Sequence, residues 1–152
     1  SLACGEWGSG RMIEPSELTH EILSHFERRA SPSRAPSLRV VITAGGTREY
    51  LDPVRCLTNA STGATGRTIA EHLLQRGHEV SYFHGEGTQT PPAHERLTLH
   101  PYISARDLEH SLLTHLRTHK IDVVIHSAAV SDYTLSTRFA TKLDSGRPLR
   151  LD

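Results

Sequence analysis

The feature that most constrains the fold is the stretch from residue 40 to residue 66, V-V-I-T-A-G-G-T-R-E-Y-L-D-P-V-R-C-L-T-N-A-S-T-G-A-T-G. Its first four residues are apolar or β-branched, which predicts a buried strand. Gly45 and Gly46 end this strand, and a polar loop then leads to a helix that we expect to begin near Thr65. The chain therefore contains a strand, a long loop flanked by glycines and a helix in succession.

The glycines on both sides of the loop favour an anion-binding site. Four residues with small or hydroxyl-bearing side chains lead into the predicted helix: Ser61, Thr62, Gly63 and Gly66. Glycine lets backbone N–H groups approach a ligand closely, and the N-terminus of a helix carries positive partial charge. We therefore predict that this loop binds phosphates, together with Gly45 and Gly46 at the end of the strand.

A nicotinamide-dependent oxidoreductase is the main alternative enzyme. Its dinucleotide turn, G-x-G-x-x-G, places the glycines directly between strand and helix, and an acidic residue ends the second strand. Here a long insert separates the two groups of glycines, and Glu86 is only a weak candidate for ribose binding. A catalytically silent nucleotide-binding or assembly module is an alternative from another class. Cys56 as a nucleophile has no supporting local motif.

Composition excludes several classes of protein. The 152 residues include 17 Lys plus Arg and 17 Asp plus Glu, and this balance gives no electrostatic basis for nucleic-acid binding. No apolar run reaches membrane-spanning length and no signal peptide is visible, so we expect a cytoplasmic protein that does not bind membranes. The two cysteines, Cys4 and Cys56, do not make a disulfide framework.

The hydrophobic pattern beyond the central stretch predicts alternating helices and strands. Three further strands are expected: residues 79–84, a short strand at Leu97 and Leu99, and residues 121–125. The first helix of this part stops at Gly77, and the second is capped by Ser104 and Asp107. Its buried stripe is expected to consist of Leu108, Leu112, Leu113 and Leu116. Such alternation is typical of an α/β fold, a Rossmann-like parallel sheet with flanking helices.

Ligands of parallel α/β sheets bind at the carboxyl ends of the strands. This rule places Gly45 and Gly46 on the same rim as residues 126–130, H-S-A-A-V. Small residues there either allow a ligand to lie against the backbone or serve only close packing.

Histidines cluster in the second helix but do not predict a metal site. His115 and His119 are four residues apart, yet no H-E-x-x-H motif or cysteine pair accompanies them. We interpret His110, His115, His119 and Lys120 as a solvated face.

Residues 42–63 resemble the phosphopantothenoylcysteine synthetase (phosphopantothenate–cysteine ligase) family, whose pattern reads I-T-[AS]-G-[GP]-T-R-E-x-[IL]-D-P-V-R-x-[IL]-[ST]-N-x-S-[ST]-G. Thr58 and Thr62 stand where many members have serine, and both keep a hydroxyl group. The resemblance implies a ligase of coenzyme A biosynthesis that joins 4′-phosphopantothenate to cysteine. It also implies a nucleoside triphosphate, usually CTP, with Mg²⁺, and a dimer of synthetase domains in the full-length protein.

The same resemblance implies roles for individual residues. Asn59 would hold the acyl group and its intermediate, and Arg55 would orient Asn59 or bind an anion, unless it only forms an ion pair at the surface. Lys142 matches the first lysine of a flap, whereas Asp144 replaces the usual second basic residue.

A second family segment, A-A-V-[AS]-D-Y, lies against the nucleotide and corresponds here to residues 128–133. Within it, Ala128 and Ala129 would contact the nucleotide, and Asp132 would lie near the nucleotide or its Mg²⁺.

The N-terminal residues resemble a different domain. The stretch A-C-G-E-W-G-S-G-R-M-I-E-P is similar to the closing segment of the FMN-dependent phosphopantothenoylcysteine decarboxylase. That resemblance implies that Cys4 donates a proton beside FMN, and that Gly10, Arg11 and Met12 close over the substrate.

We interpret the chain as three parts: residues 1–29 as the tail of a decarboxylase domain, residues 30–37 as a linker, and residues 38–152 as the N-terminal part of a synthetase domain. The parent protein is then expected to be bifunctional. Without the upstream domain, the chain alone is not expected to bind FMN. Because it stops in the unfinished strand L-R-L-D, we also expect negligible ligase activity without the downstream sequence.

Overall fold

A computed structural model describes residues 14–30, 36–134, 138–144 and 146. Cys4, Gly10, Arg11 and Met12, and the strand expected at residues 149–152, lie outside the described residues.

The chain divides into two compact units, Ser1–Pro36 and Ser37–Asp152. The first unit contains the helix α1 (Pro15–Ala30), in which the apolar side chains of Leu18, Ile22 and Leu23 are exposed. The boundary between the units falls inside the segment predicted as a linker. In the described part of the chain, no helix is both long and apolar enough to cross a membrane.

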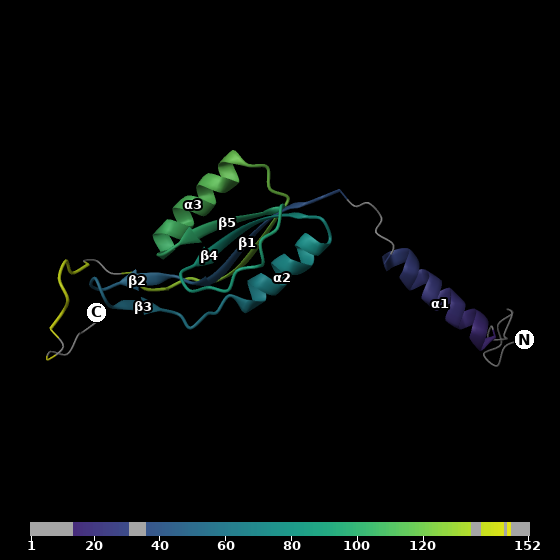
Figure 1. Cartoon of the computed structure of the whole chain (residues 1–152), viewed down its shortest axis with the longest axis horizontal. Coiled ribbons are helices and arrows are strands. Elements are labelled where there is room, and N and C mark those ends of the chain that lie inside the picture. The colour runs from purple at the N-terminus through teal and green to yellow at the C-terminus, as the bar shows by residue number, and fades with distance from the viewer. Residues whose placement is uncertain (1–13, 31–35, 135–137, 145, 147–152) are drawn as a thin grey trace, which may run out of the picture. The chain divides into compact units, whose positions relative to one another are not determined.

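The second unit is built around a parallel sheet in the strand order β5-β4-β1-β6 (Figure 1). The bounds of these strands are Arg39–Gly46 for β1, Glu79–Gly85 for β4, Leu97–Tyr102 for β5 and Val123–Ala129 for β6. The apolar run predicted as a strand forms the core of β1, where every residue after Arg39 is buried. Burial is this complete because β1 has a neighbouring strand on each side and a helix over each face.

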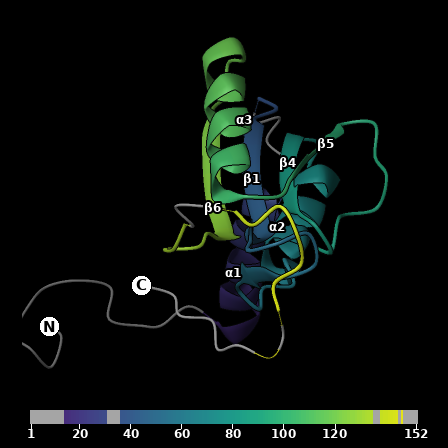
Figure 2. The same cartoon turned by 90° about the vertical axis from the view of Figure 1, so that its left-hand side faces the viewer.

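Two helices, α2 (Ala64–Gln75) and α3 (Ala105–Thr118), cover opposite faces of the sheet (Figures 1 and 2). Val40 and Ile42 pack with Ala70 of α2, whereas Val41 packs with Leu108 of α3. Successive side chains of a strand point to opposite faces, so β1 supplies both halves of the core. The predicted α/β fold is therefore confirmed.

The strand predicted at residues 121–125 begins and ends later in the structure, where β6 spans Val123–Ala129. The carboxylate of Asp122 accepts hydrogen bonds from the backbone N–H of Arg39 at 2.9 Å and from its guanidinium at 3.1 Å, just before β6 starts. At the other end, the ladder continues until Gly46 faces Ala129. The strand is longer there because small residues on both strands keep pairing beyond the apolar run.

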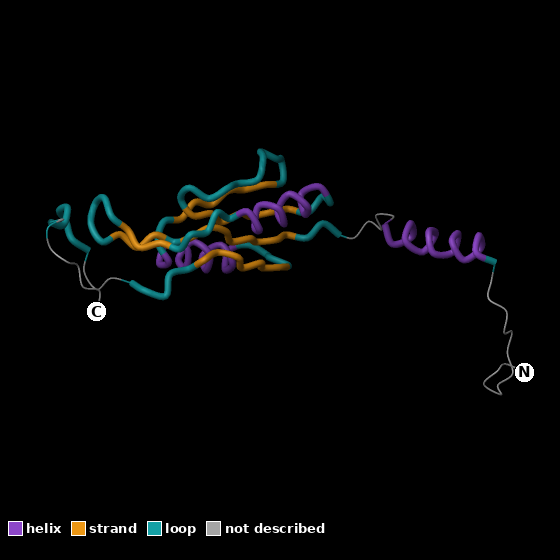
Figure 3. The backbone as a smooth tube through the Cα atoms, turned by 90° about the horizontal axis from the view of Figure 1, so that it is seen from below, coloured by secondary structure: helices purple, strands orange, loops and turns teal. Residues whose placement is uncertain are grey.

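The loop predicted between the two groups of glycines contains a two-stranded antiparallel hairpin, β2 (Arg48–Tyr50) and β3 (Cys56–Thr58) (Figure 3). In the turn between them, Asp52 accepts hydrogen bonds from the backbone N–H groups of Val54 and Arg55, both at 2.8 Å. This is the local side-chain-to-backbone bonding for which aspartate is favoured in turns.

Helix α3 begins with the predicted capping box, in which Ser104 accepts from the N–H of Asp107 at 3.1 Å and Asp107 accepts from the N–H of Ser104 at 3.0 Å. Leu108 is buried as predicted, but Leu113 is 41% exposed. Leu113 therefore lies outside the contact that Leu112 and Leu116 make with the core.

The prediction of a solvated histidine face is wrong for His115. Its ring lies edge-on to Phe83 at 5.5 Å and to His100 at 4.9 Å, and it stacks on His119 at 4.1 Å. The Nε2 atoms of His100 and His115 are buried without a hydrogen-bond partner in the described structure. The described residues contain no group of three or more His, Cys, Asp or Glu side chains that could hold a metal ion.

Candidate functional site

The carboxyl ends of β1 and β6 form one rim of the sheet. In the parallel register Gly45 faces Ala128 and Gly46 faces Ala129. The predicted placement of these four residues on a common rim is therefore confirmed. Ala128 and Ala129 are partly exposed, whereas Gly45 and Gly46 are buried, with Thr88 against Gly45 and the backbone of Asn59 against Gly46. Their role in binding stays a prediction.

Asn59 is held against this rim by its side-chain amide. Its Nδ2 donates hydrogen bonds to the carbonyl oxygens of Ala129 and Val130, both at 3.2 Å. Its Oδ1 accepts no hydrogen bond from any residue that the structure describes. Asn59 is exposed, so the free amide oxygen is open to a polar group of a ligand.

Two glycines of the site have backbones in the left-handed region, with φ of +86° at Gly45 and +73° at Gly63. A Cβ atom at Gly45 would lie 1.8 Å from Oγ1 of Thr88, and one at Gly63 would lie 2.2 Å from Cγ2 of Thr88. The positive φ and the close approach of the Thr88 side chain therefore explain glycine at both positions without a ligand. This packing brings the end of β1, the start of α2 and the loop after β4 together.

The N-terminus of α2 has no side-chain cap. Its N-cap residue is Gly63, which makes no side-chain cap, the first turn contains no acidic residue, and the N–H of Ala64 donates a long hydrogen bond of 3.4 Å to Oγ1 of Thr62. By contrast, α3 has a complete capping box. The positive end of α2 is therefore left for another anion, next to the backbone of Ser61 and Thr62.

Two buried tyrosines support the rim from opposite faces of the sheet. The hydroxyl of Tyr82 donates to the carbonyl oxygen of Gln89 at 3.0 Å and is 3.4 Å from that of Gly63. The hydroxyl of Tyr102 donates to the carbonyl oxygens of Ala44 at 2.8 Å and Gly45 at 3.2 Å. Burial raises the pKa of Tyr82 to about 12 and also raises the pKa of Tyr102, so both phenols stay protonated donors at neutral pH.

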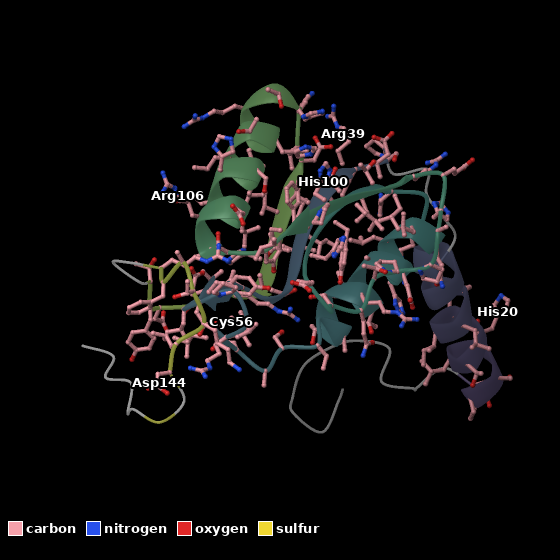
Figure 4. The ribbon with its side chains drawn as sticks, turned by 60° about the vertical axis from the view of Figure 1, so that its left-hand side comes forward. His20, Arg39, Cys56, His100, Arg106 and Asp144 are labelled. Atoms are coloured by element: carbon pink, nitrogen blue, oxygen red, sulfur yellow. The ribbon has the colours of Figure 1, made fainter. Side chains whose placement is uncertain are left out.

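The hairpin turn contains Arg55 and is bonded to the segment that carries Lys142. The Arg55 guanidinium lies 3.8 Å from Oδ2 of the buried Asp52. The same Oδ2 accepts a hydrogen bond of 3.0 Å from the backbone N–H of Leu143, the residue after Lys142. Figure 4 shows Cys56 of the hairpin and Asp144 of this segment toward one end of the unit, and Arg39 toward the other. Lys142 itself is exposed.

Asp132 follows the rim on an exposed stretch of chain. The backbone N–H of the preceding Ser131 donates a hydrogen bond of 2.9 Å to the hydroxyl of the buried Thr47. Among the described residues, Asp132 belongs to no group of three or more His, Cys, Asp or Glu side chains that could hold a metal ion. A single carboxylate fits Mg²⁺ that arrives on a nucleotide, because Mg²⁺ keeps several waters and binds substrate phosphates.

A separate cavity of about 580 Å³ lies between the hairpin and the start of α3. Its lining includes Arg48, Tyr50 and Arg138, and the Arg138 guanidinium lies 5.1 Å from the centre of the Tyr50 ring. None of the site residues predicted from the sequence lines this cavity.

The geometry does not fit the nicotinamide alternative. The hairpin stands between Gly46 and Gly63, so these glycines do not make a compact dinucleotide turn. Glu86, the candidate for ribose binding, is paired with Arg48 of β2 at 2.9 Å.

The sequence interpretation missed Asp52 and Tyr102 as parts of the site. Asp52 stands in the D-P-V-R segment, where an aspartate before proline signals a turn but not a long-range contact. For Tyr102, no signal in the sequence indicates that its hydroxyl reaches the end of β1.

Residues 36–151 match the family model described as DNA/pantothenate metabolism flavoprotein C-terminal domain. The chain is 38% identical to the coenzyme A biosynthesis bifunctional protein CoaBC of Bacillus subtilis over 153 residues, covering 99% of this chain and 37% of that protein. It is 31% identical to the CoaBC protein of Thermococcus kodakarensis over 147 residues, covering 97% and 35%.

A solved structure is also similar. The crystal structure of the C-terminal domain of a coenzyme A biosynthesis bifunctional protein CoaBC has a TM-score of 0.59 at 39% sequence identity. That likeness covers 68% of this chain and 50% of the solved chain. This chain thus spans between a third and two fifths of the length of the two curated relatives, 35% and 37%.

Proposed function

This chain belongs to the DNA/pantothenate metabolism flavoprotein C-terminal domain family, and on this premise we propose that it supplies the nucleotide- and acyl-binding part of a phosphopantothenate–cysteine ligase of coenzyme A biosynthesis. The reaction is proposed for the protein as its gene encodes it, because the chain spans only part of its relatives. The substrates are 4′-phosphopantothenate, cysteine and a nucleoside triphosphate, which we take to be CTP.

The proposed reaction has two steps. A carboxylate is a poor electrophile, so the carboxylate oxygen of 4′-phosphopantothenate first attacks the α-phosphorus of CTP. Pyrophosphate leaves, and an acyl-cytidylate remains. The amine of cysteine then attacks the acyl carbon, an amide bond forms, and cytidine monophosphate leaves with the electrons of the broken anhydride bond.

The triphosphate is proposed to lie against the uncapped start of α2. Backbone N–H groups near residues 61–63 and the positive end of the helix offset its charge. The ammonium group of Lys142 stabilises the charge that builds on the phosphates during activation. Asp132 would hold Mg²⁺ together with the phosphate oxygens.

Asn59 is proposed to hold the acyl part of the substrate through its free Oδ1, which accepts a hydrogen bond from the amide N–H of 4′-phosphopantothenate or from the amine of cysteine. Its Nδ2 is fixed by the carbonyl oxygens of Ala129 and Val130, each 3.2 Å away, so the side chain has one orientation. This orientation is the observation that carries the proposal, because it joins the loop after β3 to the rim where β1 and β6 end. Asn59 also has no net charge, which suits an acyl-phosphate next to it.

Other parts of the proposal rest on resemblance to the family. The N-terminal residues 1–29 would close a decarboxylase site, in which Cys4 protonates the product beside FMN. We also propose that the full-length protein is a dimer and acts in the cytoplasm.

The experiment that tests the proposal measures pyrophosphate. The gene-encoded protein is mixed with CTP and Mg²⁺, and pyrophosphate is followed before and after 4′-phosphopantothenate is added. Release that requires 4′-phosphopantothenate but not cysteine supports the proposed first step. No release under any of these conditions would contradict the ligase and favour a silent binding module. Replacing CTP by ATP in a parallel reaction decides the nucleotide.

A further inference from the structure

Asp52, in the turn between β2 and β3, has a fully buried side chain, although aspartate is ordinarily exposed in proteins. Both of its oxygens are engaged. Oδ1 accepts hydrogen bonds from the N–H groups of Val54 and Arg55 at 2.8 Å, and Oδ2 accepts from the N–H of Leu143 at 3.0 Å. The Leu143 N–H contributes most to a lowered pKa of Asp52, followed by the two N–H groups of the turn and the charge of Arg55.

The contact with Leu143 joins segments that are 91 residues apart in the sequence. A second hydrogen bond supports it, because the N–H of Phe139 donates to the carbonyl oxygen of Leu51 at 2.9 Å. Residues 138–144 are therefore fastened to the hairpin turn at two points. Lys142 directly precedes the second of these points, and its side chain is exposed.

We propose that Asp52 is a positioning residue, which fastens the segment carrying Lys142 to the same turn that orients Arg55. Because Asp52 is fully buried, it acts through these two cations and not on the substrate. The two charges are then held as one unit before the triphosphate binds, which lowers the cost of ordering them during the reaction. The catalytic part of this inference rests on the proposed ligase function, whereas the anchoring part does not.

The hydrogen bond between Asp52 and the N–H of Leu143 is called the anchor below, and two variants break it, one from each partner. All three backbone partners of Asp52 are N–H donors, so the amide of Asp52→Asn can keep the turn through Oδ1 but must turn its own NH₂ group toward Leu143. Leu143→Pro removes the donor and leaves Asp52 unchanged. Leu143→Ala is the matched control, because it shortens the side chain but retains the N–H group. Asp122→Asn changes a carboxylate that binds Arg39 elsewhere in the unit.

The anchor is tested by hydrogen exchange on the 152-residue chain. In both Asp52→Asn and Leu143→Pro, the amide of Phe139, which is hydrogen-bonded to Leu51 in the same turn, should exchange at least about tenfold faster, whereas the amides of β1 and α2 stay unchanged. Leu143→Ala and Asp122→Asn should exchange like the wild type in this segment. If Asp52→Asn also speeds the exchange of the β1 amides, this variant has unfolded the unit. Leu143→Pro alone then decides whether the anchor holds residues 138–144. Unchanged exchange of the segment in Leu143→Pro overturns the anchor.

The catalytic consequence is tested in the gene-encoded protein by a double-mutant cycle on formation of the acyl-nucleotidylate. Asp52→Asn and Lys142→Gln should each slow this step by at least about tenfold, and the loss in the double variant should be smaller than the product of the two single losses, because only the part of the Asp52 effect that runs through Arg55 remains. Additive losses would mean that Asp52 does not act through Lys142, and would overturn the positioning role. If the wild type forms no acyl-nucleotidylate, the proposed ligase fails together with this positioning role, but the exchange result still decides the anchor.

Discussion

The hydroxyl group of Tyr102 donates a hydrogen bond of 2.8 Å to the backbone carbonyl oxygen of Ala44, next to the paired glycines. Tyr102 is 3% exposed and ends β5, the strand at one edge of the sheet. The bond therefore reaches from β5 past β4 to the end of the central strand. It satisfies a buried carbonyl at the point where the pairing of β1 with β4 ends.

Tyr102→Phe should destabilise the second unit by about 1–3 kcal/mol, because it leaves buried carbonyl oxygens without their donor while the ring stays in place. The free energy of unfolding in urea measures this effect. Tyr50→Phe is the control, since the hydroxyl of Tyr50 contacts Glu86 at 3.5 Å in an exposed position, and its loss should cost no more than about 0.5 kcal/mol. Equal losses in the two variants would contradict a supporting role for Tyr102.

Alanine substitutions at Gly63 and Gly77 distinguish the cost of backbone strain from the cost of steric overlap. Both have positive φ, +73° and +82°, but a Cβ at Gly77 would meet nothing nearer than 3.6 Å. Gly77→Ala should therefore cost about 1–2 kcal/mol, for the left-handed backbone alone. Gly63→Ala should cost about 1–3 kcal/mol more, because its Cβ would overlap Cγ2 of Thr88.

A second substitution checks this explanation. Thr88→Ser removes only the Cγ2 atom and should recover part of the stability lost in Gly63→Ala, as seen in a double-mutant cycle of unfolding free energies. If Thr88→Ser recovers nothing, the overlap is not the cause of the loss.

The histidine cluster should make stability depend on pH. Burial lowers the pKa of His100 and of His115 below the ordinary value of 6.5, with a further contribution from His119. The folded state therefore binds fewer protons than the unfolded state between the lowered and the ordinary pKa values, so the free energy of unfolding should decrease as the pH falls below about 6.5.

Urea unfolding at pH 7.5, 6.5 and 5.5 measures this slope. The double variant His100→Phe with His115→Leu should flatten it, whereas the exposed His20→Gln should leave it unchanged. A slope that persists in the double variant would assign the pH dependence to other groups.

Local patterns in the sequence predicted the main elements well. The β-branched run of β1 needed no long-range information, because burial on both faces of a central strand produces such a run directly. The cap of α3 was also local, since Ser104 and Asp107 bond only to each other's backbone. The shared rim of β1 and β6 followed from a general rule on parallel sheets.

The features that the sequence did not reveal depend on contacts between distant residues. The strands of the hairpin have three residues each, which is too short for a reliable alternation of polar and apolar side chains. His115 is covered by Phe83 and His100, which come from two strands of the sheet. The hydrogen bond between Leu143 and Asp52 joins a loop to a turn, and no periodicity predicts such a pair.

The two half-reactions should respond differently to Lys142 and Asn59. In the gene-encoded protein, Lys142→Gln should suppress formation of the acyl-nucleotidylate by about 10²–10³-fold, because charge builds on the triphosphate in that step. Asn59→Asp should still form the intermediate but should release product more slowly by a similar factor. The new carboxylate repels the phosphate, and it loses the donor that now binds the carbonyl oxygens of Ala129 and Val130.

A single-turnover assay with labelled 4′-phosphopantothenate separates these effects, because the reaction can be quenched before and after cysteine is added. The control is Lys120→Gln, which removes an exposed lysine just after α3 and should change neither step. The distinction is physical: an ammonium acts mainly where phosphate charge increases, whereas a neutral amide oriented by two carbonyl groups acts on the acyl group. Accumulation of intermediate in Lys142→Gln but not in Asn59→Asp would therefore reverse the two assignments.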